Sequence, residues 1–394
     1  MPAEREQPHK HEFSTFADLQ SFARLPRLEA GGAELQLVTL ADIDHARWDA
    51  LGRDPASPSV FAQPWFTRAG LAHCPGGGKA RLAVVSHGNG DWLGVLPIVP
   101  RLRYGRAPFP HWAAWDHPNQ FRGTPLVRQG EASRFWQALL AGLDRRGFGR
   151  MALRLHGLPL GDPVTDALIE VAEQTRRTCK IDRHYARAML MADRPEAAAA
   201  LKGSRRRRIA SLERKAEREL GALEWRVSRS PDDMKPALAR FLALERAGWK
   251  GRAGSALGSR SGTSEFIAAI ACAAAALGQI EIAELIAGGD LLAASVHFTG
   301  PGEGFGFKMA YDEARAACGP GLLLLGRLTE HFRAGGPGRI DSCCAPGQEP
   351  ISSLWPDRLQ LVDCGIAIGP GVMRRGLGLL GLAEACYRGA PLAC

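Results

Sequence analysis

The pattern of apolar and polar residues predicts a chain of alternating helices and strands. A two-residue period indicates a strand, and apolar residues three or four positions apart indicate a helix. In the first half the predicted elements are a strand at 34–40, helices at 42–51 and 63–72, strands at 80–86 and 91–101, a helix at 132–146, a strand at 150–155 and a helix at 163–175. The His-Gly-Asn-Gly turn at 87–90 predicts a hairpin. Residues 104–127, rich in Pro, Gly and aromatic side chains, are predicted to form an irregular surface loop.

The second half repeats this order. After a further strand at 185–190, its predicted elements are a helix at 201–220, a strand at 223–228, helices at 231–247 and 265–277, strands at 280–286, 291–298 and 305–310, a helix at 321–334, and strands at 339–342 and 359–368. Both halves run through helices, a hairpin, a helix and a strand. The sequence therefore predicts an α/β fold of two related domains, at 34–195 and 196–394, behind an N-terminal arm at 1–33.

Composition narrows the class of protein. The chain has 394 residues, of which 45% are hydrophobic and 23% charged, as is typical of globular proteins. The longest apolar run, at 266–277, is shorter than the roughly 20 residues that cross a bilayer. The first residues lack the apolar core of a signal peptide. We therefore expect a cytoplasmic protein.

Cysteine usage and charge add two expectations. The nine cysteines are an odd number and no export signal is expected, so we expect reduced thiols. Without a Cys-x-x-Cys pair we expect no metal. The adjacent Cys343-Cys344 is interpreted either as a source of a nucleophile or as a pair of buried structural thiols. The net charge of +9 suits anionic partners without choosing among them. No nucleophile-elbow, Walker or dinucleotide-binding glycine motif is present at a strand–helix junction.

Residues 280–342 hold the clearest candidate chemistry. Three strands lead into a helix that begins at Gly319-Pro320-Gly321, after a loop that contains Arg315. Helix N-termini present unpaired N–H groups that bind phosphate, and glycine permits a close approach. This pattern predicts a pyrophosphate site, and an ordinary strand-to-helix turn with Pro in its first turn is the alternative.

The hairpin formed by 291–298 and 305–310 suggests an active-site face. If its Pro-Gly turn is the centre, Phe298 pairs with Phe305 and Ser295 with Lys308. Side chains alternate between the faces of a strand, so Ser295, His297 and Lys308 would line one face. A solvated sheet face is the alternative interpretation.

Two further features carry charge. Glu245, at the end of the predicted helix 231–247, is either a general base or a surface residue. The segment 202–220 is a basic amphipathic helix, interpreted as a solvated face that attracts an anionic substrate, or as a membrane- or nucleic-acid-binding patch. Few aromatic residues interleave with its cations, which argues against base stacking.

Several motifs resemble the CelD-like acyltransferases of the GNAT superfamily, often described as acetyltransferases of cellulose biosynthesis. They are Glu245-x-x-x-Trp249-Lys250-Gly251, Phe307-Lys308-x-x-Tyr311-Asp312, Pro320-Gly321-x-Leu323-Leu324, the strand-end Asp341 and the loop at 117–127. The resemblance implies two tandem GNAT-like domains, as in Fem-type transferases, each a mixed, largely antiparallel sheet flanked by helices. The loop after Asp341 departs from the family pattern.

The resemblance also implies a site. Acetyl-coenzyme A or a longer acyl-coenzyme A would be the donor, and an amine or hydroxyl of a lipid, glycan or small molecule the acceptor. The implied residues are Glu245, His297, Lys308, Tyr311 and Asp312 for catalysis, Arg315, Gly319, Pro320, Gly321 and Leu322 for the donor, and Trp249, Lys250 and Asp341 for the acceptor. With this donor we expect no nucleic-acid partner and direct attack without an acyl-enzyme, and 202–220 is the candidate for peripheral membrane contact.

Two other functions stay open at this point. A Fem-like aminoacyl transferase would use charged tRNA, which the basic helix suits, although the long inserted coiled coil usual in that class is absent. A non-catalytic binding protein would keep the fold without the chemistry.

Overall fold

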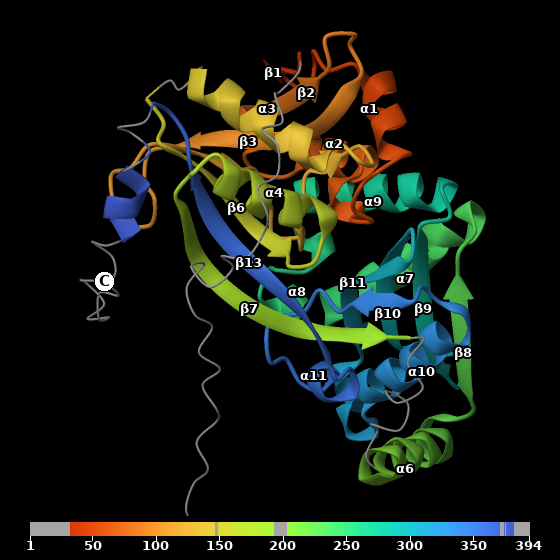
Figure 1. Cartoon of the computed structure of the whole chain (residues 1–394). Helices are drawn as coiled ribbons and strands as arrows, with labels where there is room; N and C mark the ends of the chain where they lie inside the picture. The colour runs from red at the N-terminus through yellow and green to blue at the C-terminus, as the bar shows by residue number, and fades with distance from the viewer. Residues whose placement is uncertain (1–31, 146–148, 193–202, 371–373, 375, 382–394) are drawn as a thin grey trace, which may run out of the picture. The chain divides into compact units, whose positions relative to one another are not determined.

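The computed structural model describes residues 32–145, 149–192, 203–370, 374 and 376–381. The predicted arm at 1–33 therefore lies almost wholly outside the described residues. Within them, 13 strands form one sheet, with the order β1-β2-β3-β4-β6-β13-β7-β12-β11-β10-β9-β8 and with β5 paired to β3 (Figure 1). The mixed, mostly antiparallel sheet is flanked by helices, which confirms the predicted fold class.

Most predicted elements of the first half are present within a few residues. They are β1 (Glu34–Val38), α1 (His45–Gly52), α2 (Pro64–His73), β2 (Arg81–Ser86), β3 (Trp92–Arg101), β4 (His111–Ala114), β5 (Leu126–Val127), α3 (Ala132–Arg145), β6 (Ala152–Pro159), α4 (Pro163–Gln174) and β7 (Cys179–Met191). The prediction of an irregular loop at 104–127 is wrong in part, because it contains β4 and β5. β4 has only four residues, and its pairing with β3 and β6, rather than its own sequence, makes it a strand.

The second half follows its prediction closely. Its elements are α6 (Gly203–Leu220), β8 (Leu223–Ser228), α7 (Pro231–Ala247), α8 (Trp249–Arg252), α9 (Ser261–Ala276), β9 (Ile280–Ala287), β10 (Asp290–Gly300), β11 (Glu303–Tyr311), α10 (Pro320–Gly335), β12 (Arg339–Asp341), α11 (Ile351–Leu354) and β13 (Asp357–Ala367). Short 3-10 turns are η2 (Val60–Ala62), η3 (Gly77–Lys79), η4 (Leu257–Ser259) and η5 (Glu313–Cys318). α7 has clear local signals, since Ser230 caps it, Pro231 opens it and Gly248 follows it.

The two halves share a topology. In each, a strand and helices precede three antiparallel strands, and a helix then leads to a strand that lies parallel to the third. β4 pairs with β6 in parallel in the first half, as β11 pairs with β12 in the second. The β11–β12 pairing ends at Phe305 and Asp341, and β11 then continues to Tyr311 without β12. Beyond Phe305, this edge of β11 therefore has no ladder with β12.

Strand pairing crosses the predicted domain boundary at 195/196. β13, from the end of the chain, lies between β6 and β7, while β7 pairs on its other edge with β12. The two halves therefore share one sheet, and the two-domain division stays a prediction about organisation.

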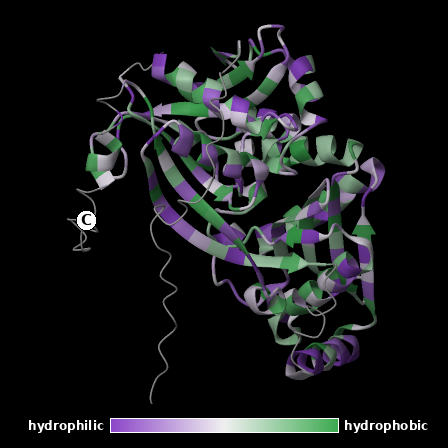
Figure 2. Ribbon diagram, viewed as in Figure 1, coloured by the Kyte–Doolittle hydropathy of each residue, from purple (hydrophilic) through white to green (hydrophobic). Residues whose placement is uncertain are grey.

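Helices cover both faces of the second half. Ala294 of β10 belongs to a core with α7 and α9, whereas its neighbour Ala293 packs with the leucines of α10. Phe66 of α2 enters the α7–α9 core, where its ring lies 5.4 Å from that of Phe266. α6, at the side of α10, is largely hydrophilic (Figure 2). Among the described residues, no helix combines the length and apolarity needed to cross a membrane.

Candidate functional site

An open pocket lies where α7 ends and β11 ends. Four of the residues that the sequence singled out line it: Glu245, Trp249, Lys250 and Tyr311. α8 turns the chain so that Trp249 and Lys250 face the end of β11. The indole of Trp249 is 55% exposed, and the ring of Tyr311 is 38% exposed. Exposed aromatic rings beside a charged pair are typical of a binding site for a partly apolar ligand.

Glu245 is buried at the base of this pocket. Its Oε1 lies 3.1 Å from Lys250 Nζ, and its Oε2 accepts a 2.8 Å hydrogen bond from the backbone N–H of Leu257. Lys250 Nζ also donates to the Met309 carbonyl at 2.9 Å. With 3% exposure, Glu245 is not the surface residue of the alternative interpretation. The pair joins α7 and α8 to β11 and places one cation at the pocket.

Lys308 is a second cation close to this pair. Its Nζ lies 5.3 Å from the ring centre of Phe121 and 5.7 Å from that of Phe307. Burial, together with the positive charge of Lys250, lowers the pKa of Lys308 to about 8. A lysine with this pKa is partly neutral near pH 7, so it can accept a proton.

His297 does not join Lys308 on one face, so that prediction is wrong. Phe298 does pair with Phe305, but a β-bulge then shifts the register, and Lys308 pairs with Val296. One extra residue moves every later side chain to the opposite face. His297 therefore lies under α10, with its ring 5.0 Å from Phe332, while Lys308 faces the side of α7.

The start of α10 has the form expected of an anion site. Gly319 adopts φ +63°, a left-handed conformation that favours glycine, and Pro320 opens the helix. A Cβ on Gly321 would lie 3.3 Å from the ring of Tyr311, so this pocket residue lies against the first turn of the helix. Lys215 of α6 donates to the Ala317 carbonyl at 3.0 Å, which places its charge beside this turn.

Asp312 and Arg315 lie between β11 and α10. The Asp312 carboxylate accepts a 2.9 Å hydrogen bond from Ala314 N, and so caps η5. The Arg315 guanidinium, 36% exposed, lies 3.4 Å from Asp290 and 3.8 Å from Asp312. Both residues are near the helix start, where Asp312 makes a capping contact, and the catalytic role expected of it stays a prediction.

Asp341, predicted to bind the acceptor, is fully buried and saturated. Its two oxygens accept from Arg122 Nε at 2.9 Å, from Arg187 at 2.7 and 2.6 Å, and from the Cys343 N–H at 2.9 Å. Burial alone would raise the pKa of Asp341, but the two guanidiniums outweigh burial and hold it below its usual range. The carboxylate organises the junction of strands and has no oxygen left for a substrate.

The sequence reasoning missed most of this junction. Arg122 also binds Glu303 through two hydrogen bonds, of 3.0 and 2.6 Å, and Arg187 donates to the Phe121 carbonyl at 3.0 Å. Arg122 was named only as part of the loop at 117–127, and Glu303 looked like a turn residue. The local sequence gave one indication of this ion pair: a charged residue, Glu303, directly follows the Pro-Gly turn.

Cys343 is buried, which favours the interpretation as a structural thiol over that as a nucleophile. Burial, together with the charge of Asp341, raises its pKa well above the usual range. A thiol that stays protonated is a poor nucleophile. Its backbone has φ +52°, which turns the chain sharply after β12.

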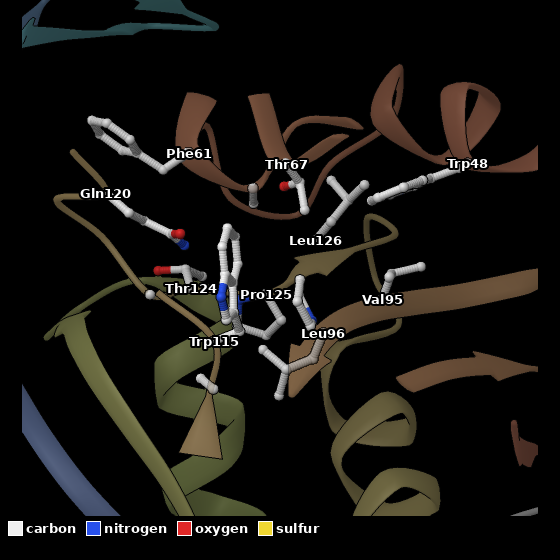
Figure 3. A pocket seen from close by; sticks show the side chains of 14 residues that line it. Trp48, Phe61, Thr67, Val95, Leu96, Trp115, Gln120, Thr124, Pro125 and Leu126 are labelled. Carbon is white, nitrogen blue, oxygen red and sulfur yellow. The ribbon is translucent and has the colours of Figure 1, made fainter. Parts of the chain in front are cut away.

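A second pocket lies in the first half (Figure 3). Trp115, Gln120, Thr124 and Leu126 of the loop region line it, facing Trp48 of α1 and Thr67 of α2. Much of the segment predicted to lie on the surface is thus buried around this pocket.

Comparisons with known proteins give a family match and several likenesses of fold. Residues 203–350 match the family described as "Acetyltransferase (GNAT) domain". The fold resembles FemX, at 11% identity and a TM-score of 0.51, with 84% of this chain and 96% of that one covered. It also resembles the C-terminal domain of a putative lysylphosphatidylglycerol synthetase from Agrobacterium fabrum, at 13% identity and a TM-score of 0.52, covering 87% and 97%. A third is L-PGS from Bacillus licheniformis, at 13% identity and a TM-score of 0.50, covering 86% and 96%. A comparison with curated proteins found no match.

The second half of the chain therefore contains a GNAT-type acetyltransferase domain. The matched residues run from α6 to the loop before α11 and include the Glu245 pocket, Lys308 and the start of α10. The structural likenesses, at 11–13% identity, establish a shared fold over most of the chain. The narrower resemblance to CelD-like acyltransferases stays a prediction.

Proposed function

We propose that the chain transfers an acyl group from a coenzyme A thioester to an amine or hydroxyl held in the pocket of Glu245, Trp249 and Lys250. The observation that carries this proposal is the position of Tyr311. Its ring lines the pocket and meets the first turn of α10 at Gly321. A donor anchored at that turn would therefore end beside the acceptor.

The start of α10 would hold the donor's pyrophosphate. The first N–H groups of a helix have no partners within it, and the helix dipole adds positive potential there. Because Gly321 has no side chain, the ring of Tyr311 can lie against this turn and border the anion site. The charge of Lys215 supports anion binding at the same place.

The edge of β11 beyond Phe305 would hold the rest of the donor. Beyond Phe305, β11 has no ladder with β12. Backbone N–H and C=O groups on such an edge can bind the amides of the pantetheine arm and polarise the thioester carbonyl. The thioester carbon would then lie near Lys308 and the acceptor.

The reaction is a direct acyl transfer. The acceptor nitrogen or oxygen attacks the thioester carbon and loses its proton to neutral Lys308, and the C–S bond breaks as coenzyme A leaves as a thiolate that then takes a proton. Lys308 suits this role because its pKa of about 8 lies near working pH. The Glu245–Lys250 pair would orient the acceptor. Cys343, buried and protonated, takes no part.

Aminoacyl transfer from charged tRNA is the second candidate. The observation that favours it is the surface of α6, where Arg207, Arg208, Arg214 and Arg218 are exposed. Cationic helices bind phosphate backbones in a salt-dependent way. The likeness to FemX and to lysylphosphatidylglycerol synthetases is a likeness of fold, and it does not distinguish a tRNA donor from a coenzyme A donor. The same surface would suit contact with an anionic membrane if the acceptor is a lipid.

Thermal unfolding in the presence of acetyl-, octanoyl- and palmitoyl-coenzyme A tests the proposal. A ligand that binds the folded state raises the melting temperature in proportion to its affinity. Stabilisation that grows with chain length points to a lipid acyl group, and a shift with acetyl-coenzyme A alone points to acetylation. If no thioester stabilises the chain while charged tRNA binds in a salt-sensitive way, the second candidate replaces the first.

A further inference from the structure

A histidine–carboxylate cluster lies on the face of the sheet opposite Lys308. Glu281 of β9 and His297 of β10 are cross-strand partners, and His331 of α10 packs over them. His297 Nε2 lies 3.4 Å from Glu281 Oε2, and His331 Nε2 lies 2.8 Å from the same oxygen. One potential ligand atom from each residue lies within 4.8 Å of the others. Three separate elements thus converge on one small volume.

His297 is left without a well-formed hydrogen bond. Its side chain is 2% exposed, and neither ring nitrogen has a partner of full hydrogen-bond geometry among the described residues. Its nearest partner is the Glu281 carboxylate, at a long 3.4 Å from Nε2. Buried polar groups are normally paired, and an exception calls for a physical reason such as an ion. An imidazole nitrogen pointed at a carboxylate and at a second imidazole is a typical metal ligand.

We propose that Glu281, His297 and His331 bind a divalent transition-metal ion, with zinc the best match. Two histidines and one carboxylate are a common zinc ligand set, with water in the fourth position. Zinc bonds of roughly 2.0–2.2 Å place tetrahedral ligands about 3.3 Å from one another. The two separations from Glu281 Oε2, 3.4 and 2.8 Å, bracket that value, and all three ligand atoms lie within 4.8 Å of one another, so side-chain adjustment would complete the site.

Arg229 competes with the metal for this site. Its Nε donates to Glu281 Oε1 at 2.6 Å, and its Nη2 lies 3.3 Å from His331 Nε2. The guanidinium is 57% exposed, so it can rotate into solvent when a cation arrives. Glu281 and His331 are themselves partly exposed, at 16% and 18%, which gives an ion a path to the buried His297.

The consequence is structural. His331 lies near the end of α10, where the helix dipole is negative and favours a cation. A metal would fasten α10 to β9 and β10. It would hold the helix without touching the pocket of Glu245, so this inference does not depend on the proposed acyl transfer. The expectation of no metal rested on cysteine spacing and did not weigh histidines on separate elements.

Titration of the metal-free full chain with Zn²⁺ and Co²⁺ tests the site. We expect one equivalent to bind, a rise in melting temperature, and a Co²⁺ visible spectrum of nitrogen and oxygen ligation. Trp225, whose ring lies 6.1 Å from His331, should report Co²⁺ binding by quenched fluorescence, and Trp225→Phe should remove that signal.

Variants decide which residues bind the ion. His331→Gln, at a partly exposed position that tolerates the change, should weaken Zn²⁺ binding by at least about 10–100-fold. Arg229→Gln should strengthen it, and His45→Ala, at an exposed histidine elsewhere, should leave it unchanged. Binding that survives both His331→Gln and His297→Ala, or a Co²⁺ spectrum with thiolate charge-transfer bands, would overturn the proposal, as would the absence of any binding.

Discussion

Arg122 and Glu303 lie 181 residues apart in the chain and form a bidentate ion pair, with Nη2–Oε1 at 2.6 Å and Nη1–Oε2 at 3.0 Å. Each side chain is 1% exposed. Through Arg122 Nε the pair extends to Asp341, and from there to Arg187. A loop of the first half is thereby fixed to β11 and β12 along the short ladder that joins these two strands.

Removing Arg122 should destabilise the whole described fold. Arg122→Met leaves two buried carboxylates short of a cation, and breaking a buried pair in this way costs about 3–5 kcal/mol. Urea unfolding followed by far-UV circular dichroism measures the loss. Arg134→Ala is the matched control, because the 56% exposed Arg134 pairs with Glu131 at the surface and such pairs contribute about 0–1 kcal/mol. Equal losses in the two variants would refute the role given to Arg122.

Transfer should become faster as Lys308 loses its proton. Because burial and Lys250 lower its pKa to about 8, kcat/KM should rise with pH through about 8 and level off above it. Lys308→Arg keeps the positive charge at all these pH values, so it should abolish the rise and most of the activity. Release of coenzyme A with an acceptor found by screening amines and alcohols gives the rate. A wild-type rise kept by Lys308→Arg would assign the proton transfer to another group.

The same lysine should make stability depend on pH. The unfolded chain holds this proton up to the ordinary lysine pKa of 10.5, while the folded chain releases it near 8. Between these values the unfolded state binds more protons, so stability rises with pH over that window. Lys308→Met should remove this rise and leave stability at pH 7 equal or higher. Chemical unfolding at pH 7, 8.5 and 10 shows whether it does.

A negative charge at the start of α10 should weaken donor binding without destabilising the helix. Gly321→Asp places a carboxylate where the helix dipole favours it, and its Cβ meets only the exposed Tyr311 ring, which can shift, so the fold should hold. The same carboxylate repels a pyrophosphate, and we expect coenzyme A to bind at least about tenfold more weakly, or roughly 1.4 kcal/mol. Isothermal titration with coenzyme A measures this. Gly338→Asp, at an exposed glycine with open space around it, is the control that should bind normally.

Loss of the Cys343 thiol should leave the chemistry intact. Because burial keeps this thiol protonated, Cys343→Ala should retain activity within a few-fold and show no acyl adduct by intact-mass analysis. The exposed Cys272 should react with iodoacetamide in the native protein, while Cys343 should not. A folded Cys343→Ala variant without activity would point to an acyl-enzyme and contradict direct attack.

Much of the fold could be read from the sequence. Residues 223–228 and 231–247 were predicted to the residue, because alternation in β8 and the Ser-Pro start and Gly end of α7 are local signals. Glu245, Trp249, Lys250 and Tyr311, which line one pocket, were each named from the family resemblance as members of a larger set, and spacing alone did not suggest them.

The wrong predictions share one cause, which is that each depends on how strands pair in the folded sheet. The bulge that moved Lys308 to the face opposite His297 inserts one residue that no local pattern marks, since it depends on how β10 and β11 pair. β4 was predicted as loop because four residues between prolines carry too little periodicity. Placing β13 between β6 and β7 required pairing with strands about 200 residues earlier.

Local sequence patterns were enough to place most helices and strands, and they put glycines at the start of α10. These properties depend on neighbours a few residues away, which propensity, capping and alternation report. Only the tertiary structure decided which charges are buried together, such as Arg122 with Glu303 and Glu281 with His297 and His331. The reason is physical: the energy of a buried charge depends on partners that the folded chain brings from distant positions, and the sequence does not show that proximity.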